Sequence, residues 1–149
     1  MDENDAISVL ENLMETCKDG QKGYLEAATH IKRPDLKAFF NEQSLERSRF
    51  AGELDAELIR LGKHDEKPKG SLAGTLHRAW IDTKVGLGGG DQTILDWLEH
   101  GEDIAKDNYN KALTGSLPAN VMEIVRKQAA SVQAAHDKVK SLRDMAKAA

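Results

Sequence analysis

Cysteine is almost absent from this chain, since Cys17 is the only one in 149 residues. An internal disulfide is therefore excluded, and such sparse cysteine usage fits a reducing compartment. The chain also lacks any apolar run close to the roughly 20 residues that cross a membrane. The N-terminal stretch MDENDAISVLENL is acidic and has neither the basic nor the apolar zone of a signal peptide. We expect a cytoplasmic protein with no membrane partner.

A basic excess is missing as well. Lysine and arginine total 21 against 25 acidic residues, which gives a net charge of −4. Phosphate binding needs a basic face, so we expect no nucleic-acid partner. Proline occurs only 3 times, whereas alanine, leucine, lysine, glutamate and aspartate dominate. This composition favours an all-α chain, and its length fits one domain over residues 1–149.

Apolar residues recur at three- and four-residue steps along most of the chain, which is the spacing of one helix face. They predict four long helices, over about residues 6–31, 34–61, 92–113 and 118–146. Pro34 suits a first helical turn, Gly62 a C-terminal stop and Asp91 an N-terminal cap. A shorter connector helix is expected over about residues 72–85.

The lengths of the connections predict the topology. The breaks near Pro34 and Gly115 are short, so the first and second helices pair antiparallel, as do the third and fourth. The middle connection is long enough to return along the bundle. A four-helix bundle with one long crossover has the ferritin-like topology.

Several polar residues fall near the midpoints of these helices, at positions that would otherwise be core. Midpoints of antiparallel helices meet at one height, so we expect these residues to share one layer. Its expected members are Cys17, Gln43, Glu46, Arg47, Glu102, Gln128 and His136. Buried charges need paired charges or a metal ion. The layer therefore either satisfies itself by ion pairing or holds a cation through Glu46, Glu102 and His136.

The histidine spacings argue against a complete di-iron centre. That centre takes Glu-x-x-His from each of two helices. No Glu-x-x-His exists in this chain, and the nearest matches are Gln133-x-x-His136 and Glu46-x-x-Arg49. Arginine stays protonated and cannot ligate a metal. If any ion binds, iron or manganese is expected, with water in the remaining positions.

Four features together resemble a known family. They are the stretches CKDGQKGYLEAA, GSLAGTLHRAWIDTK and LEHGED, and the Leu117-Pro118 helix start. Their order and spacing resemble the PA2169 family of four-helix-bundle proteins, which is domain of unknown function 2383. The resemblance covers nearly the whole chain. It implies a bacterial ferritin-like bundle, often encoded in stress-responsive settings, and supplies no catalytic residues. The family pattern often has arginine where this chain has His100.

The connector stretch carries the pair His77 and Arg78, which we expect to reach acidic partners such as Asp19, Glu99 or Asp103. Two interpretations stay open. In one, a small polar pocket lies under the crossover; in the other, Arg78 forms a structural salt bridge. The expected polar structural cluster comprises Asp19, Arg47, Arg49, His77, Arg78 and Glu99.

Two functions from different classes follow from these patterns. The first is a non-catalytic binding or assembly module linked to the bacterial stress response, with an incomplete di-iron site. The second is a metal-binding protein with weak oxidase or storage activity in the layer of Glu46, Glu102 and His136. A homo-oligomer, with a dimer as the first expectation, is compatible with both.

Overall fold

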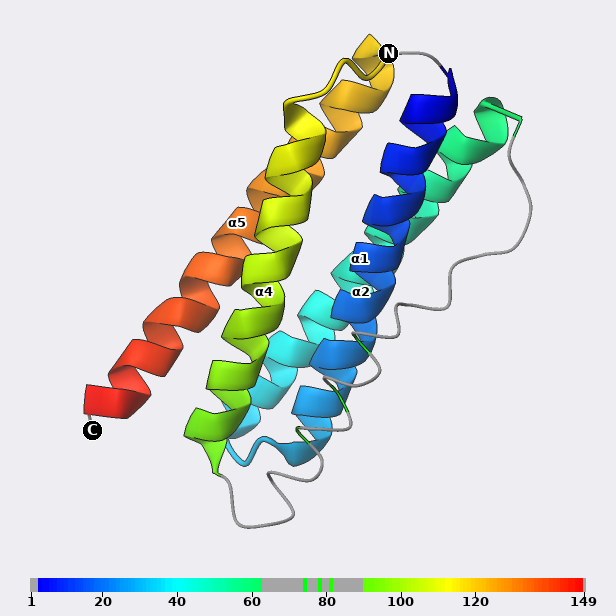
Figure 1. Cartoon of the computed structure of the whole chain (residues 1–149). Coiled ribbons are helices and arrows are strands. Elements are labelled where there is room, and N and C mark those ends of the chain that lie inside the picture. Colours follow the sequence, from blue (N-terminus) through cyan, green and yellow to red (C-terminus); the bar gives the residue numbers. More distant parts are fainter. Residues whose placement is uncertain (1–2, 63–73, 75–77, 79–80, 82–89, 149) are drawn as a thin grey trace.

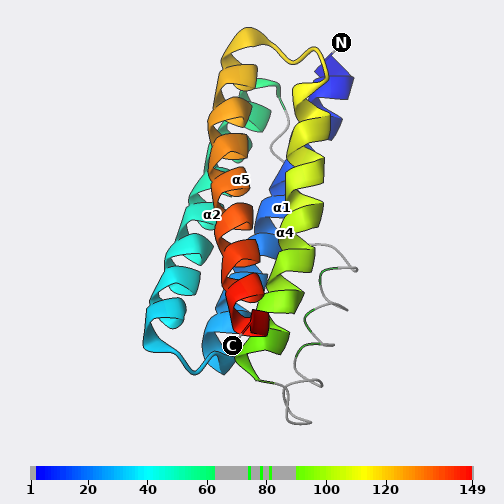
Figure 2. The ribbon, with the colours of Figure 1, turned by 90° about the vertical axis from the view of Figure 1, so that its left-hand side faces the viewer.

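A computed structural model of the chain describes residues 3–62, 74, 78, 81 and 90–148. Four helices are formed, α1 (Glu3–His30), α2 (Pro34–Arg60), α4 (Asp91–Leu113) and α5 (Ala119–Ala148). They lie side by side as a bundle (Figure 1). Helices α2 and α4 run in one direction, and α1 and α5 run in the other. The rotated view in Figure 2 shows the same arrangement, with α5 beside α4.

The expected fold is confirmed, because the described residues form an all-α, ferritin-like bundle. Each long helix begins and ends within three residues of the predicted bounds. The connector helix expected over residues 72–85 lies outside the described residues, apart from Gly74, Arg78 and Ile81, which are helical. Among the described helices, none is apolar over enough length to span a membrane.

The helix ends follow from local chemistry. Pro34 starts α2, where its missing N–H costs no helical hydrogen bond. Gly62 follows α2 with a φ of +85°, a left-handed conformation that glycine adopts without a Cβ clash. At the start of α4, the Gly90 carbonyl accepts hydrogen bonds from the amides of Thr93 and Ile94. The Lys32 amide donates to the Asp91 carboxylate, which ties the α1–α2 turn to the start of α4.

The core has two parts, separated by the polar layer. One apolar cluster includes Leu13 and Phe50, and the other includes Phe40 and Trp97. The buried polar side chains of Arg47, Glu102 and His136 lie between the two clusters along their helices. Of the residues expected in one polar layer, Arg47, Glu102 and His136 are buried at this level, whereas Gln43 and Glu46 are only partly buried.

Candidate functional site

The centre of the bundle holds a buried ion pair between α2 and α4. Arg47 Nη2 donates to Glu102 Oε2 across 2.6 Å, and the two side chains are only 2% and 3% exposed. Burial lowers the pKa of Arg47, but the adjacent Glu102 carboxylate more than offsets this, so the net shift is upward. The guanidinium is therefore permanently charged, and Glu102 is its counter-ion.

Helix α1 shapes the space that this pair occupies. The Arg47 guanidinium carbon lies 5.5 Å from the centre of the Tyr24 ring, within cation–π range. At Gly20, an added Cβ atom would lie 2.8 Å from Arg47 Nη1. Glycine at position 20 thus leaves the room that the long arginine side chain needs.

These residues do not fit a di-iron centre. Glu102 is the α4 carboxylate of the central layer, and it already bonds to a cation that cannot be deprotonated. A metal ion beside it would meet the positive charge of Arg47. The chain also has no Glu-x-x-His pair to supply the other ligands. At the height of this layer, an internal ion pair thus joins α2 to α4.

A second buried polar chain crosses the bundle next to this layer. The Tyr109 hydroxyl donates to Gln128 Oε1 (2.7 Å) and lies 3.0 Å from Cys17 Sγ. Because the Tyr109 proton is used on Gln128, the Cys17 thiol donates to Tyr109. Gln128 Nε2 donates to the Phe50 carbonyl and to Glu53. Side chains of α1, α4 and α5 and groups of α2 are thereby joined in one hydrogen-bonded line.

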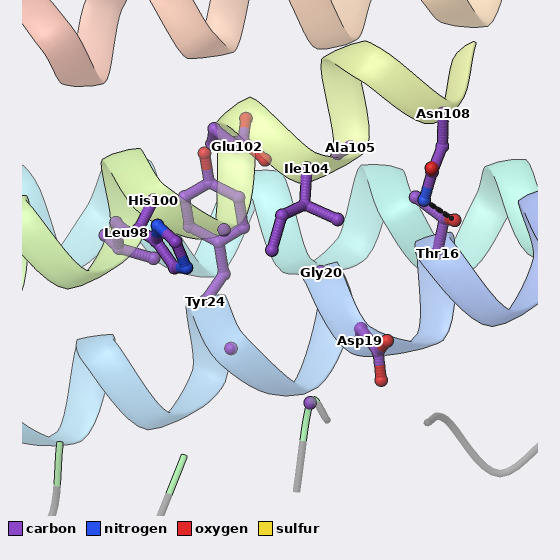
Figure 3. Close-up of a pocket in the computed structure, with 13 residues that line it drawn as sticks. Thr16, Asp19, Gly20, Tyr24, Leu98, His100, Glu102, Ile104, Ala105 and Asn108 are labelled. Carbon is purple, nitrogen blue, oxygen red and sulfur yellow. Dashed lines mark hydrogen bonds between the residues drawn. The ribbon is translucent and has the colours of Figure 1, made fainter. Parts of the chain in front are cut away.

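A cavity of about 460 Å³ lies between α1 and α4, and we call it the α1–α4 cavity (Figure 3). Its lining residues come from three separated stretches of the chain. They are Thr16, Asp19, Gly20, Gly23, Tyr24, Gly74, Leu98, His100, Gly101, Glu102, Ile104, Ala105 and Asn108. Four of these residues are glycines, which add no side chain to the wall.

Polar groups stand at defined places around the cavity. Asn108 Nδ2 donates to the Thr16 hydroxyl across 3.0 Å, the contact drawn in Figure 3. Arg78 Nη1 lies 3.8 Å from Asp19 Oδ1, one of the acidic partners expected for it. A Cβ atom on Gly74 would clash with the same Asp19 oxygen, so the Gly74 backbone lies directly against Asp19.

The Tyr24 phenol completes the inner wall of the cavity beside Glu102 (Figure 3). Its hydroxyl is buried and has no hydrogen-bond partner of good geometry among the described residues. Burial and the nearby Glu102 carboxylate raise the pKa of Tyr24 well above its usual value. The phenol is therefore neutral, and its hydroxyl faces the Glu102 carboxylate.

A carboxylate and histidine group lies between α4 and α5, away from the cavity. Its members are Glu99, Asp103 and His136, and one donor atom from each falls within 4.8 Å of the others. His136 Nε2 lies 2.6 Å from Asp103 Oδ1, and Arg143 Nη1 lies 2.8 Å from Glu99 Oε2. Within the described part of the chain, this group has the composition and proximity of a cation site.

In the structure, the site residues predicted from the sequence contact separate partners. Of the predicted metal ligands, Glu102 pairs with Arg47, His136 contacts Asp103, and Glu46 accepts a hydrogen bond from Ser131. This ligand set stays a prediction, although each member has its own partner. In the predicted polar cluster, Arg49 pairs with Glu53 on the surface, and Glu99 pairs with Arg143. His77 lies outside the described residues.

The structure adds a specific arrangement to two features of the sequence. One is the pair Glu99 and Asp103, whose i,i+4 spacing places both carboxylates on one face of α4. The other is the cavity wall, which Gly20, Gly23 and Gly101 leave open. The sequence shows the acidic pair at i,i+4 spacing, and it shows Gly20 and Gly23 three residues apart. Neither pattern identifies the helix that packs against these residues.

The fold and this central layer define a ferritin-like four-helix bundle. Within that class, the chain belongs to the family described as Domain of unknown function (DUF2383), whose model matches residues 5–115. The match runs from α1 through α4 and leaves out α5.

A similar solved structure is that of a Dps1 mutant from Mycobacterium smegmatis. The two structures agree with a TM-score of 0.72 at 14% sequence identity, over 95% of this chain and 96% of the other. At that identity the likeness concerns the fold alone. No protein with a curated description matches the chain in sequence.

Proposed function

We propose that this protein is a non-catalytic binding module and that its ligand site is the α1–α4 cavity. One observation carries the proposal. Three of the stretches on which the family resemblance rests, around Gly20, Gly74 and Gly101, meet at this cavity. A cavity at the meeting point of these stretches is the part of the bundle best suited to a function shared across the family.

The size and walls of the cavity support a small, largely apolar ligand. Its volume of about 460 Å³ falls within the range of about 300–1,000 Å³ typical of ligand pockets. Leu98, Ile104 and Ala105 supply apolar wall. The Tyr24 hydroxyl and the His100 ring supply polar groups that would fix a ligand's orientation.

The pairing of the charged groups supports binding rather than catalysis. Glu102 is neutralised by Arg47, and Asp19 lies beside Arg78. General-base and nucleophilic catalysis need a group that an adjacent residue activates toward the substrate. Among the described residues that line the cavity, the carboxylates are instead engaged by cations of the protein.

The test uses N-phenyl-1-naphthylamine, an uncharged dye whose fluorescence rises in apolar sites. The dye is excited at a wavelength longer than the tryptophan absorption band. Its fluorescence then reports binding to the full-length chain. Ile104→Trp enlarges a side chain that lines the cavity, so we expect it to weaken dye binding at least tenfold. Ile104 is 50% exposed, which leaves the fold able to accept the larger ring.

Met145→Trp is the matched control, because Met145 is an exposed apolar residue of α5 (65% exposed) and does not line the α1–α4 cavity. It should leave dye binding unchanged. Equal binding by both variants, or no saturable binding by the unsubstituted protein, would contradict the proposed function. Thermal melts of the three proteins check that each is folded.

We propose that the protein assembles as a dimer. In this dimer the outer face of α2 packs against α2 of a second copy of the chain. Leu45, Gly52 and Ile59 recur every seven residues on that face, and Leu45 is 74% exposed. When two α2 helices cross antiparallel at Gly52, Leu45 of one copy meets Ile59 of the other. Arg49 then faces Asp55, a complementary charge.

Light scattering at micromolar concentration tests the dimer. Leu45→Lys should shift the mass toward that of a 16.4 kDa monomer, whereas Leu25→Lys, an exposed leucine on α1, should not. A monomer without either substitution would contradict the dimer and leave the ligand-binding proposal intact. The link to bacterial stress response rests on the family resemblance and is part of the same proposal.

A further inference from the structure

The group between α4 and α5 has features that go beyond the proposed function and share no residue with the α1–α4 cavity. Glu99 and Asp103 are one helical turn apart on α4, and His136 faces them from α5. His136 is buried, Glu99 is half-buried, and Asp103 is the most exposed of the three. The site therefore has a buried inner ligand and an outer one at the solvent edge.

The distances suit one cation with little rearrangement. Ligand atoms at about 2.1 Å from an ion lie at most about 4.2 Å apart. The three donor atoms here lie within 4.8 Å of one another, and His136 Nε2 is already 2.6 Å from Asp103 Oδ1. A side-chain movement of about half an ångström would bring all three into coordinating range.

Asp137 fixes the orientation of the His136 ring from the side opposite Asp103. His136 Nδ1 lies 3.0 Å from Asp137 Oδ1, and Gln133 Nε2 donates to the same Asp137 oxygen across 2.9 Å. Metal-binding histidines commonly donate their second ring N–H to a carboxylate, which directs the other nitrogen at the ion. With Nδ1–H donating to Asp137, Nε2 faces Asp103, and an ion bound there would take the place of the proton that Nε2 shares with this carboxylate.

Arg143 supplies the positive charge that an ion would otherwise bring. Its Nη1 contacts Glu99 Oε2 at 2.8 Å, and its other nitrogens approach Asp96 and Asp144. Asp96 and Asp144 can keep the guanidinium on the protein surface if it leaves Glu99. Arg143 therefore competes with an ion for Glu99 without blocking Asp103 or His136.

We infer that Glu99, Asp103 and His136 form a mononuclear site for a divalent first-row transition ion, with Asp137 as the residue that orients His136. Two carboxylates favour Mn²⁺ and Fe²⁺, and the imidazole extends the range to Zn²⁺. Three protein ligands leave room for water in the remaining positions. The site lies between α4 and α5 and is separate from the Arg47–Glu102 pair.

The experiment measures binding of Mn²⁺ by electron paramagnetic resonance and of Zn²⁺ by calorimetry to chelator-treated full-length protein. We expect one equivalent per chain. Asp103→Asn changes a partly exposed residue and should lower the affinity for Zn²⁺ at least tenfold, as should His136→Ala. Asp137→Ala should lower it about 10- to 100-fold, the usual effect of losing such an orienting partner.

Arg143→Gln is the sharpest variant, because removal of the competing cation should raise the affinity several-fold. A structural ion-pair cluster would instead bind no ion in any variant. Glu123→Gln, which removes an exposed carboxylate elsewhere on α5, is the charge control and should leave binding unchanged. Absence of saturable binding of both ions overturns the inference, as does binding that survives Asp103→Asn and His136→Ala.

Discussion

The backbone of Gly20 lies so close to Arg47 that a Cβ atom at Gly20 would be 2.8 Å from Nη1 of the guanidinium. The distances to Cγ and Cδ of the same side chain would be 3.4 and 3.6 Å. Because Arg47 is locked to Glu102 in the interior, it has little freedom to move aside. The ion pair thus depends on a glycine of α1 as well as on its two charged members.

Gly20→Ala and Gly52→Ala form a matched pair that tests this dependence. Both substitutions improve helix propensity by about 1 kcal/mol. No atom of the same chain lies within 4 Å of a Cβ placed on Gly52, so Gly52→Ala should raise the free energy of unfolding of the monomer. Gly20→Ala should lower it by about 1–3 kcal/mol through overpacking. Urea unfolding measures both, and equal stabilisation by the two variants would contradict the close approach.

Glu102→Gln and Arg47→Met each remove one member of the buried pair. An uncompensated buried charge typically costs about 3–5 kcal/mol, and Glu102→Gln leaves Arg47 in that state. Replacement of both residues with apolar ones of similar volume, Arg47→Met with Glu102→Leu, should recover much of the loss. Chemical unfolding of Arg47→Met, Glu102→Leu and the double variant gives the coupling energy. Additive losses would show that the two side chains act independently.

The sequence predicted the helices closely because their apolar spacing, caps and breaks are local properties of the chain. It also placed Arg47, Glu102 and His136 at one height, since antiparallel helices of equal length align their midpoints. It could not choose the partner of each residue, which depends on how far every helix is rotated about its axis. A small rotation of α4 decides whether Glu102 or Glu99 faces α5.

The partners of Gln133 and Asp19 illustrate the same limit. The spacing of Gln133 and His136 resembled a di-iron helix that had lost a ligand, yet Gln133 bonds to Asp137 instead. The contact of Asp19 with Gly74 depends on how closely the connector approaches α1. Interhelical distances of this kind follow from the packing of the whole bundle, and no local pattern encodes them.

Tyr109→Phe and Tyr24→Phe remove the same hydroxyl from two buried rings with different partners. The Tyr109 hydroxyl bonds to Gln128 and Cys17, so its loss leaves buried polar groups unpaired. We expect Tyr109→Phe to cost about 1–3 kcal/mol. Tyr24→Phe should cost less than 1 kcal/mol by the same principle, because its hydroxyl has no hydrogen bond of good geometry among the described residues. Thermal and urea unfolding check the difference, and equal losses would contradict it.

Cys17 makes the stability of the bundle sensitive to alkaline pH. Burial raises the pKa of its thiol from the usual 9.0 to about 11, although the Tyr109 hydroxyl, which can donate to the thiolate once it forms, opposes the shift. Between these two values the unfolded chain loses the thiol proton while the folded chain keeps it. The free energy of unfolding should therefore fall as pH rises through this window, by up to about 2–3 kcal/mol.

Unfolding titrations at pH 8, 9, 10 and 11 measure the decline, and Cys17→Ala is the control that should flatten it. The tyrosines Tyr24 and Tyr109, whose pKa values are also raised by burial, should cause the decline that persists in Cys17→Ala above about pH 10. Alkylation by iodoacetamide gives an independent check. At pH 8.5 the folded protein should react at least tenfold more slowly than the urea-unfolded chain, because the thiolate is the reactive form. Fast alkylation of the folded protein would mean that Cys17 reaches solvent.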